Sequence, residues 1–358
     1  MWIEKLSVNN CRLLNKVSIE LSNHLNLIVG KNASGKTSLL ESLSLLSNGR
    51  SFRTTHVSEV ISYNQDNILI SAKIHLNETS AQIGIEKSIK KTRIRINKKD
   101  IYSQSELSVY LPITVIHPGS IDLITGSPKM RRSYIDWITF YLFPDFQVKW
   151  KEYQHILKQR NFCLKEPKHH YAIDQWTKEL IPLQPILTDY RQKAFDLLKP
   201  KLAKISKHLL DDEIILDFNS GLPKDLNLDE KSLLDFYNKK LEYDIRLKRT
   251  TAGVHRADFR IFMDDKLASQ SASRGQLKLI AIALLLSQSE AIIKKDNEQG
   301  VLLIDDLASE LDSKNKKTLL YYLANLEKQV IITSTKSIEN INIPWKVFHV
   351  KHGEITEE

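Results

Sequence analysis

The eight residues from Gly30 to Thr37 constrain the fold of this chain more than any other stretch. They are Gly30, Lys31, Asn32, Ala33, Ser34, Gly35, Lys36 and Thr37, and they fit the phosphate-binding template G-x-x-x-x-G-K-[ST]. The apolar run from Leu25 to Val29 predicts a strand before this loop, and Thr37 to Leu46 predicts a helix after it. A strand, a glycine-rich loop and a helix in this order predict an α/β nucleotide-binding fold.

Each residue type in the loop has a chemical reason. Gly30 and Gly35 allow the backbone to wrap a polyphosphate, so that successive N–H groups and the helix N-terminus face it. Lys36 is expected to reach the β- and γ-phosphates, and the Thr37 hydroxyl to hold Mg²⁺. We therefore predict that ATP and Mg²⁺ bind here.

The composition is that of a globular protein. At 358 residues the chain is long enough for two domains, and 42% of its residues are apolar and 27% charged. No apolar run reaches the length of a membrane span, and the first residues do not have the form of a signal peptide, so we expect a cytoplasmic, nucleoid-associated protein without a membrane partner. Cys11 and Cys163 lack metal-binding spacing, which favours reduced structural thiols.

The formal net charge of +9 is unevenly distributed. Residues 86–100 hold seven Lys or Arg against two acids, and residues 145–210 hold thirteen against seven. Such basic runs are either solvated faces or a surface for a polyanion. For DNA contact we single out five cations: Lys91, Arg93, Arg95, Lys201 and Lys204.

Hydrophobic periodicity divides the chain into a head and an insertion. Alternating segments between residues 68 and 97 predict an antiparallel sheet, and Ile113–Ile116 predicts a further buried strand. From Pro128 the period becomes helical, with breaks expected at Pro144, Pro167, Pro182 and Pro185. We predict an N-terminal part of an ATPase head at 1–127, an inserted, mainly helical arm at 128–249, and the C-terminal part of the head at 250–358.

Two further segments belong with the phosphate loop. The apolar strand Val301–Ile304 ends in Asp305 and Asp306, where the first carboxylate is expected to hold Mg²⁺ and the second to polarise a water as a general base. Upstream, Ser273, Arg274, Gly275 and Gln276 open an apolar helix, an arrangement that suits either a helix cap or an anion site.

The order of phosphate loop, S-x-G-Q helix, acidic strand and the segment Ser309, Glu310, Leu311 and Asp312 resembles the ABC-type ATPases. The resemblance implies that two heads close face to face over two ATP molecules. Ser273, Arg274, Gly275 and Gln276 of one copy would then face the γ-phosphate bound to Lys36 of the other, and Ser309 to Asp312 would line the seam of that homodimer.

Within that superfamily the chain resembles the RecF family of bacterial recombination mediators. The resemblance covers the whole chain and rests on several strings: Gly49 to Arg53, Pro128 to Trp137, Leu157 to Asn161, His255 to Asp258, Ser273 to Lys278 and Leu303 to Asp312. It implies an ATP-dependent DNA-binding protein that dimerises on double-stranded or gapped DNA, works with RecR and RecO, and promotes RecA loading. Slow, DNA-stimulated ATP hydrolysis would act as the release switch.

Some positions depart from the wider ABC pattern. Asp306 stands where most such ATPases have Glu, which suggests slow hydrolysis, and Arg274 replaces the usual glycine after the serine. The usual switch histidine is absent after Val330–Ile332, where Thr333 to Thr335 follow, and the strand expected to lead to a glutamine ligand ends in His117. His255 has either a functional or a structural role.

Two alternatives remain. A transporter subunit would bind nucleotide in the same way, but the long insertion and the basic bias disfavour it. An SMC-type chromosome-organising head would carry long heptad segments, whereas here Lys36 and Ser273 are only 237 residues apart.

Overall fold

The computed structural model describes residues 1–76, 79–292, 300–306, 311–336 and 343–358. The chain forms two compact units. The head unit comprises Met1–Ser120, His208–Leu210 and Lys278–Glu358, and the arm unit comprises Ile121–Lys207 and Asp211–Leu277. Among the described residues, no helix is long and apolar enough to cross a membrane.

A six-stranded sheet of the head unit carries the predicted phosphate loop. Its strand order is β15-β14-β3-β13-β12-β8, and all neighbours are parallel except the β14–β15 pair. The five parallel strands therefore end at one edge, where α/β proteins bind their ligands. The strands are β3 (Leu25–Val29), β8 (Ile113–Ile116), β12 (Val301–Ile304), β13 (Val330–Ser334), β14 (Lys346–Lys351) and β15 (Glu354–Glu357).

The second sheet of the head unit is antiparallel, as the alternating pattern predicts. Its strand order is β2-β1-β4-β5-β6-β7, and its buried positions alternate with exposed ones. The strands are β1 (Trp2–Cys11), β2 (Leu14–Glu20), β4 (Asn67–Leu76), β5 (Thr79–Ser88), β6 (Thr92–Ile96) and β7 (Lys99–Ile101).

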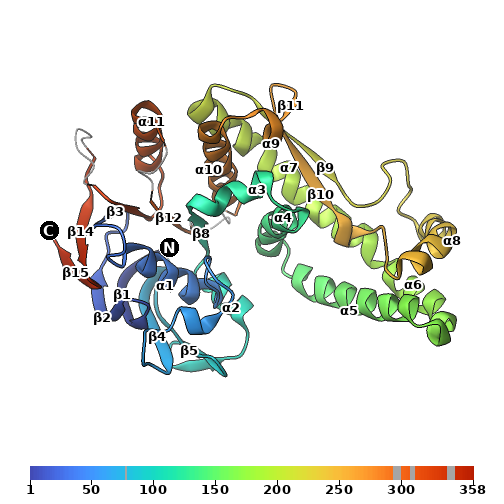
Figure 1. The fold of residues 1–358 in the computed structure, drawn as a ribbon, viewed down its shortest axis with the longest axis horizontal. Coiled ribbons are helices and arrows are strands. Elements are labelled where there is room, and N and C mark those ends of the chain that lie inside the picture. Colours follow the sequence, from blue (N-terminus) through green and yellow to red (C-terminus); the bar gives the residue numbers. More distant parts are fainter. Residues whose placement is uncertain (77–78, 293–299, 307–310, 337–342) are drawn as a thin grey trace. The chain divides into compact units, whose positions relative to one another are not determined.

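Helix α1 (Lys36–Asn48) joins the two sheets into one core. Its leucines, including Leu39, Leu43 and Leu46, pack in a single buried cluster with residues from both sheets. Figure 1 shows α1 on one side of the parallel sheet and α11 on the other. The remaining short helices of this part are η1 (Val57–Glu59), α2 (Gln104–Tyr110) and η2 (Pro118–Ile121), and α11 spans Ser313–Ala324.

The arm is mainly helical, as predicted, but one expected break is wrong. Pro185 lies in the first turn of α7, where a missing N–H costs no intrahelical hydrogen bond, and Pro200 is accommodated inside the same helix. The arm helices are α3 (Asp122–Thr125), α4 (Pro128–Leu142), α5 (Phe146–Lys165), η3 (Pro167–Ala172), α6 (Ile173–Leu180), α7 (Leu183–Leu210) and α8 (Glu230–Leu247).

The chain returns to the head unit later than the expected boundary at residue 250. Strand β10 pairs with β9 and β11 in a three-stranded sheet, and residues 250–277 group with the arm unit. Backbone pairing of β10 with β9 decides this, and local sequence pattern does not reveal which strands pair. The elements are β9 (Ile214–Asn219), η4 (Val254–Arg256), β10 (Asp258–Met263), β11 (Lys266–Leu267), α9 (Ala268–Ser271) and α10 (Arg274–Ala291).

Candidate nucleotide site

The loop from Gly30 to Thr37 lies at the carboxyl edge of the parallel sheet, between β3 and α1. A Cβ at Gly30 would stand 2.5 Å from the Val350 carbonyl oxygen, so no larger residue fits there. Gly35 has φ of 116°, and Ala33 also has a positive φ of 60°. These two left-handed residues let the loop turn tightly before α1 begins at Lys36.

Lys36 closes this loop from inside. Its side-chain nitrogen donates hydrogen bonds to the carbonyl oxygens of Gly30, at 2.8 Å, and Lys31, at 2.9 Å. Burial lowers the pKa of Lys36, and the carboxylates of Asp306 and Asp305 oppose that shift. The ammonium group is thus held within the loop, with two carbonyl partners that phosphate oxygens could replace.

The loop is tied to the acidic strand by one hydrogen bond. The Thr37 hydroxyl donates to the Asp305 Oδ1 atom at 2.9 Å. Because Mg²⁺ in ATPases is held by one hydroxyl, one carboxylate and phosphate oxygens, this adjacent pair fits the ion. Among the described residues, no group of three or more His, Cys, Asp or Glu side chains is placed to hold a metal ion.

Thr333 is a site residue that sequence reasoning missed. This fully buried threonine lies near the carboxyl end of strand β13. Its hydroxyl donates to Asp305 Oδ1 at 2.8 Å and accepts from the Asp306 N–H at 2.8 Å. Asp306 has a positive φ of 53°, which is unusual for a residue with a side chain. The available signal was a polar residue at the carboxyl end of an otherwise apolar strand.

These residues form what we call the nucleotide corner: Gly30–Thr37, Asp305, Asp306 and Thr333. His117 follows the neighbouring strand β8, whose Ile116 carbonyl accepts from the Asp305 N–H at 2.8 Å. The His117 ring lies 5.2 Å from that of Phe52, between ring centroids. His117, which ends the strand that was expected from the sequence to lead to a glutamine ligand, is therefore in contact with an aromatic side chain.

The second predicted segment, which we call the signature turn, is Ser273–Gln276 in the arm unit. The Gln276 N–H donates to Ser273 Oγ at 3.3 Å, and the Ser273 N–H donates to Gln276 Oε1 at 2.9 Å. This reciprocal pair is a capping box at the start of α10. The helix begins at Arg274, three residues before the predicted start at Leu277, because the turn itself supplies the cap.

Gly275 within the signature turn is not explained by packing in the chain. A Cβ at this position would meet no heavy atom within 4 Å, and its φ is not in the left-handed region. Glycine in a helix is less stable than alanine by about 0.5–1 kcal/mol, so its presence here costs stability without an internal benefit. Close approach of another molecule would account for it.

The predicted seam segment is only partly described. Ser309 and Glu310 lie outside the described residues. Asp312 caps α11, since its side chain accepts from the Asn315 N–H at 2.8 Å.

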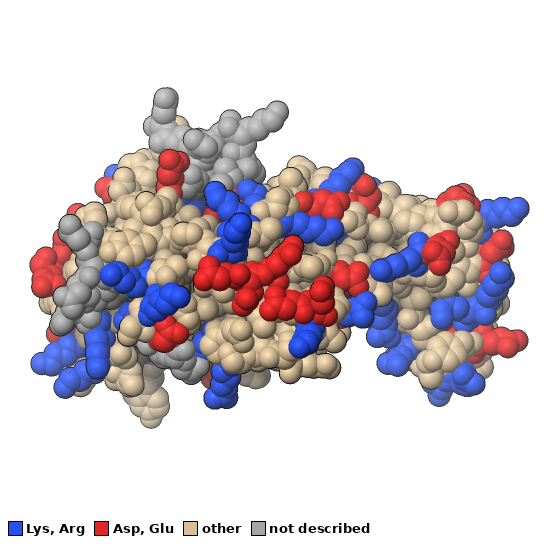
Figure 2. All heavy atoms as spheres, turned by 90° about the horizontal axis from the view of Figure 1, so that it is seen from above, with Lys and Arg blue, Asp and Glu red and all other residues tan. Residues whose placement is uncertain are grey.

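The predicted DNA-contacting cations of the antiparallel sheet are partly neutralised. Arg93 and Arg95 on β6 both donate to Asp100, at distances of 2.8–3.1 Å. These hydrogen bonds lower the pKa of Asp100 to about 2. Lys91 lies exposed in the adjoining turn. On the face seen in Figure 2, basic side chains are interspersed with acidic ones.

The other two predicted cations lie on α7 in the arm unit. Lys204 is exposed and Lys201 is partly exposed, one helical turn apart. Neither forms an ion pair within the described part of the chain. Their charge is therefore less compensated than that of Arg93 and Arg95.

His255 has a structural environment. The Tyr153 hydroxyl lies 2.7 Å from its Nδ1 atom, and its Nε2 atom lies 3.1 Å from the Thr250 carbonyl oxygen. Burial lowers the pKa of His255 to about 4. A neutral imidazole that accepts from Tyr153 and donates to Thr250 satisfies both contacts.

Comparisons with known proteins agree on one family. The family model described as RecF/RecN/SMC N terminal domain matches residues 2–356. The chain is 35% identical to the DNA replication and repair protein RecF of Psychromonas ingrahamii, over 100% of both chains. It is 34% identical to the protein of the same name from Stutzerimonas stutzeri, over 100% of this chain and 98% of that one.

Solved structures give the same picture. A structure of the recombination mediator protein RecF with ATP in the RecFOR pathway matches with a TM-score of 0.88 and 26% identity, covering 100% of this chain and 97% of that one. The Smc head domain of Pyrococcus furiosus matches with a TM-score of 0.61 and 16% identity, covering 100% of this chain and 96% of that one, which shows a shared fold.

Proposed function

Since the chain belongs to the RecF family, we propose that it is an ATP-dependent DNA-binding protein of DNA replication and recombinational repair. The observation that carries the proposal is the contact between the Thr37 hydroxyl and Asp305, which joins the phosphate loop to the acidic strand at one sheet edge. Membership of the family and ATP-bound relatives support ATPase activity.

We assign ATP to the nucleotide corner. The loop N–H groups from Lys31 to Thr37 and the start of α1 would cradle the phosphates. Lys36 would exchange its carbonyl partners, Gly30 and Lys31, for β- and γ-phosphate oxygens. The donor that now closes the loop is therefore the same one that would hold the nucleotide.

Thr37 and Asp305 would hold Mg²⁺, which when bound neutralises charge on the transferred phosphate. Asp306 would accept a proton from the attacking water as general base. Thr333 would fix both acids, since its hydroxyl touches the Asp305 carboxylate and the Asp306 N–H. The shorter reach of Asp than of Glu supports slow hydrolysis suited to a switch.

We propose that the signature turn of a second copy completes the site. Ser273, Arg274, Gly275 and Gln276 are polar or small, and the space around Gly275 supports close approach of a phosphate. To donate to that phosphate, Ser273 would keep its hydroxyl hydrogen available while its oxygen caps the helix. Ser309 to Asp312 would then line the seam of the homodimer.

In this proposal, ATP-driven pairing closes two basic surfaces on double-stranded or gapped DNA, and hydrolysis releases them. Contacts to phosphates by Lys91, Arg93, Arg95, Lys201 and Lys204 would be independent of sequence and dependent on salt. The RecFOR name of the structural relative supports work with RecR and RecO, and its description as a recombination mediator supports promotion of RecA loading. The head unit and the arm unit described above would act as ATPase head and inserted arm.

An SMC-type chromosome-organising head is the second candidate, and the fold match to the Smc head supports it. Full-length identity to the RecF relatives favours the first. A transporter subunit has no comparable support.

The proposal is tested by measuring ATP turnover and oligomeric state with and without duplex DNA at two salt concentrations. We expect a dimer with ATP, faster turnover with DNA, and loss of DNA binding at high salt. DNA-independent turnover by a monomer whose behaviour is insensitive to salt would contradict it.

A further inference from the structure

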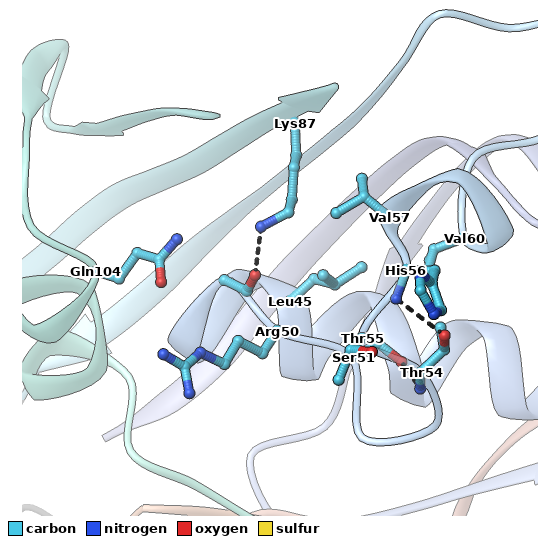
Figure 3. A pocket seen from close by; sticks show the side chains of 11 residues that line it. Leu45, Arg50, Ser51, Thr54, Thr55, His56, Val57, Val60, Lys87 and Gln104 are labelled. Carbon is cyan, nitrogen blue, oxygen red and sulfur yellow. Dashed lines mark hydrogen bonds between the residues drawn. The ribbon is translucent and has the colours of Figure 1, made fainter. Parts of the chain in front are cut away.

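A pocket of about 330 Å³ lies in the head unit at the far end of α1 from the phosphate loop. It is closed by the turn after α1, by strand β5 and by the start of α2 (Figure 3). Its lining residues are Leu45, Gly49, Arg50, Ser51, Thr54, Thr55, His56, Val57, Val60, Lys87 and Gln104. Leu45, which lines the pocket, follows Lys36 by nine residues, which is about 14 Å of helix.

The charge in this pocket is positive. Lys87 and Arg50 both line it, and none of its described lining residues is acidic. Within the described residues, neither cation forms an ion pair. Burial, and to a lesser extent the positive charge of Arg50, lowers the pKa of Lys87.

One hydrogen bond of Lys87 stabilises the end of helix α1. Its side-chain nitrogen donates to the Gly49 carbonyl oxygen at 2.7 Å, at the C-terminal end of α1 (Figure 3). A cation there offsets the partial negative charge of the helix end. Two N–H groups of the Lys87 ammonium remain available to a ligand, and Arg50 is not needed to stabilise the helix end.

The turn that forms the rim is held in place by its own hydrogen bonds. The Ser44 hydroxyl donates to the Arg50 carbonyl at 3.0 Å, and the Ser51 hydroxyl accepts from the N–H groups of Arg53 and Thr54. Ser51 also donates to the buried carboxylate of Glu41. The pocket therefore exists without a ligand, so binding need not order this loop.

Leu45, Val57 and Val60 form an apolar wall of the pocket. Gln104, which lies beside Gly49, adds one amide that can both donate and accept. A volume of about 330 Å³ lies at the lower end of the range for small-molecule pockets. Positive charge at one side and apolar side chains at the other suit a phosphate carried on a compact, partly apolar body.

We infer that this pocket is a second nucleotide site, in which Lys87 and Arg50 hold a phosphate monoester and the apolar wall takes the sugar and base. Two sources share this chemistry: a free nucleoside monophosphate and the phosphorylated end of a DNA strand. The site is independent of the ATP assigned to the nucleotide corner, because no residue of Gly30–Thr37 lines it.

The test is a calorimetric titration of the full chain, saturated with ADP and Mg²⁺, with thymidine 5′-monophosphate and with thymidine. We expect one monophosphate per chain and at least about tenfold weaker binding of thymidine. Arg50→Met should weaken monophosphate binding about tenfold without unfolding the chain, because Arg50 is exposed. Lys87→Met should do the same, and Lys87→Arg should restore binding.

Lys90→Met is the matched control, because Lys90 lies exposed in the turn after β5 and does not line the pocket. Unchanged binding by Arg50→Met, or displacement of the monophosphate by ADP, would overturn the inference. Competition by a 5′-phosphorylated but not a 5′-hydroxyl oligonucleotide identifies a strand end as the source, and competition by neither identifies the free nucleotide. Equal competition by both would show backbone binding outside the pocket and refute the site.

Discussion

The nucleotide corner and the signature turn reach their conformations in different ways. In the corner, residues distant in sequence hold one another, since Thr37 and Thr333 both donate to Asp305. Lys36 adds hydrogen bonds to two carbonyls of its own loop. In the signature turn, Ser273 and Gln276 only cap their own helix. Lys36 and Thr333 of the corner are buried, whereas Ser273 and Arg274 in the arm unit are exposed.

The difference indicates that the corner is formed by contacts within one chain, whereas we propose that the signature turn acts on a second molecule. A corner fixed by buried, long-range contacts is prepared to bind before any partner arrives. The signature turn is held only by local hydrogen bonds, and no neighbouring atom in the chain requires a glycine at position 275. Mutations should therefore damage binding in the corner and pairing in the turn.

The largest effect is expected from Lys36→Ala. Loss of the charged donor should weaken ATP binding about ten- to a hundredfold and abolish ATP-driven dimers. Equilibrium titration and light scattering would measure the two effects. Lys16→Ala, an exposed lysine on β2, is the control. If the Lys36→Ala protein still dimerised with ATP, the nucleotide corner would not be the ATP site that drives pairing.

Next in size are substitutions in the signature turn that preserve its helix cap. Ser273→Asp keeps a good cap but places a negative charge where a phosphate should approach, so ATP binding to the single chain should persist while pairing is lost. Gly275→Ala should raise stability by about 0.5–1 kcal/mol and yet weaken pairing. Denaturant unfolding and light scattering would separate these effects.

Ser273→Thr retains both cap and hydroxyl and should pair as the original chain does. Normal ATP-driven pairing by Ser273→Asp would break the proposed contrast between turn and corner.

Thr333→Val should slow hydrolysis about tenfold with little change in the KM for ATP. The isosteric change removes the hydroxyl that orients Asp305 and leaves the Asp306 N–H without that acceptor, at a cost in stability of about 1–3 kcal/mol. Steady-state kinetics would report kcat and KM separately. Thr114→Val, at a buried threonine of β8 in the same sheet, should leave kcat unchanged; an equal loss there would assign the effect to packing.

In the arm unit, His255 should make stability depend on pH. Its folded pKa of about 4 lies below the ordinary value of 6.5, so the unfolded chain takes up the proton first. Its contribution is complete above about pH 6.5 and is lost as the pH falls towards 4, by up to about 3 kcal/mol. Urea unfolding between about pH 7.5 and 5 should show a smaller pH dependence in His255→Gln, and an identical one would refute this role.

The smallest expected effect is a change in DNA affinity, and it shows whether the head unit or the arm unit contributes more to DNA binding. Asp100→Asn should free Arg93 and Arg95 and, if the antiparallel sheet contacts DNA, raise affinity by about two- to fivefold. Charge reversal at Lys201 and Lys204 tests α7 in the same salt titration. A loss only with the α7 pair, and no gain with Asp100→Asn, would assign DNA binding to the arm unit.

Much of the fold follows from local pattern. The strands β3, β8 and β12 match their predicted bounds, because continuous apolar runs in a parallel sheet end abruptly at polar loops. Helix α6 lies between the breaks predicted at Pro167 and Pro182. The break predicted at Pro185 was wrong because a proline interrupts a helix only beyond its first turn, and Pro185 lies within the first turn of α7.

Other features depend on contacts between distant segments. The pairing of β10 with β9 places residues 250–277 in the arm unit, although the sequence predicted them as part of the head. The role of Thr333 depends on β13 lying beside β12, which no local signal reveals.

The sequence by itself determined the chemistry of this protein: the phosphate loop, its paired acids and the family were legible because each needs particular residues at particular spacings. Tertiary structure alone decided which side chains hold those residues in place. Thr333 reaches Asp305, and Asp100 restrains Arg93 and Arg95, because strand pairing brings distant positions within hydrogen-bond reach. It also decided that a basic turn after α1 overlies a pocket.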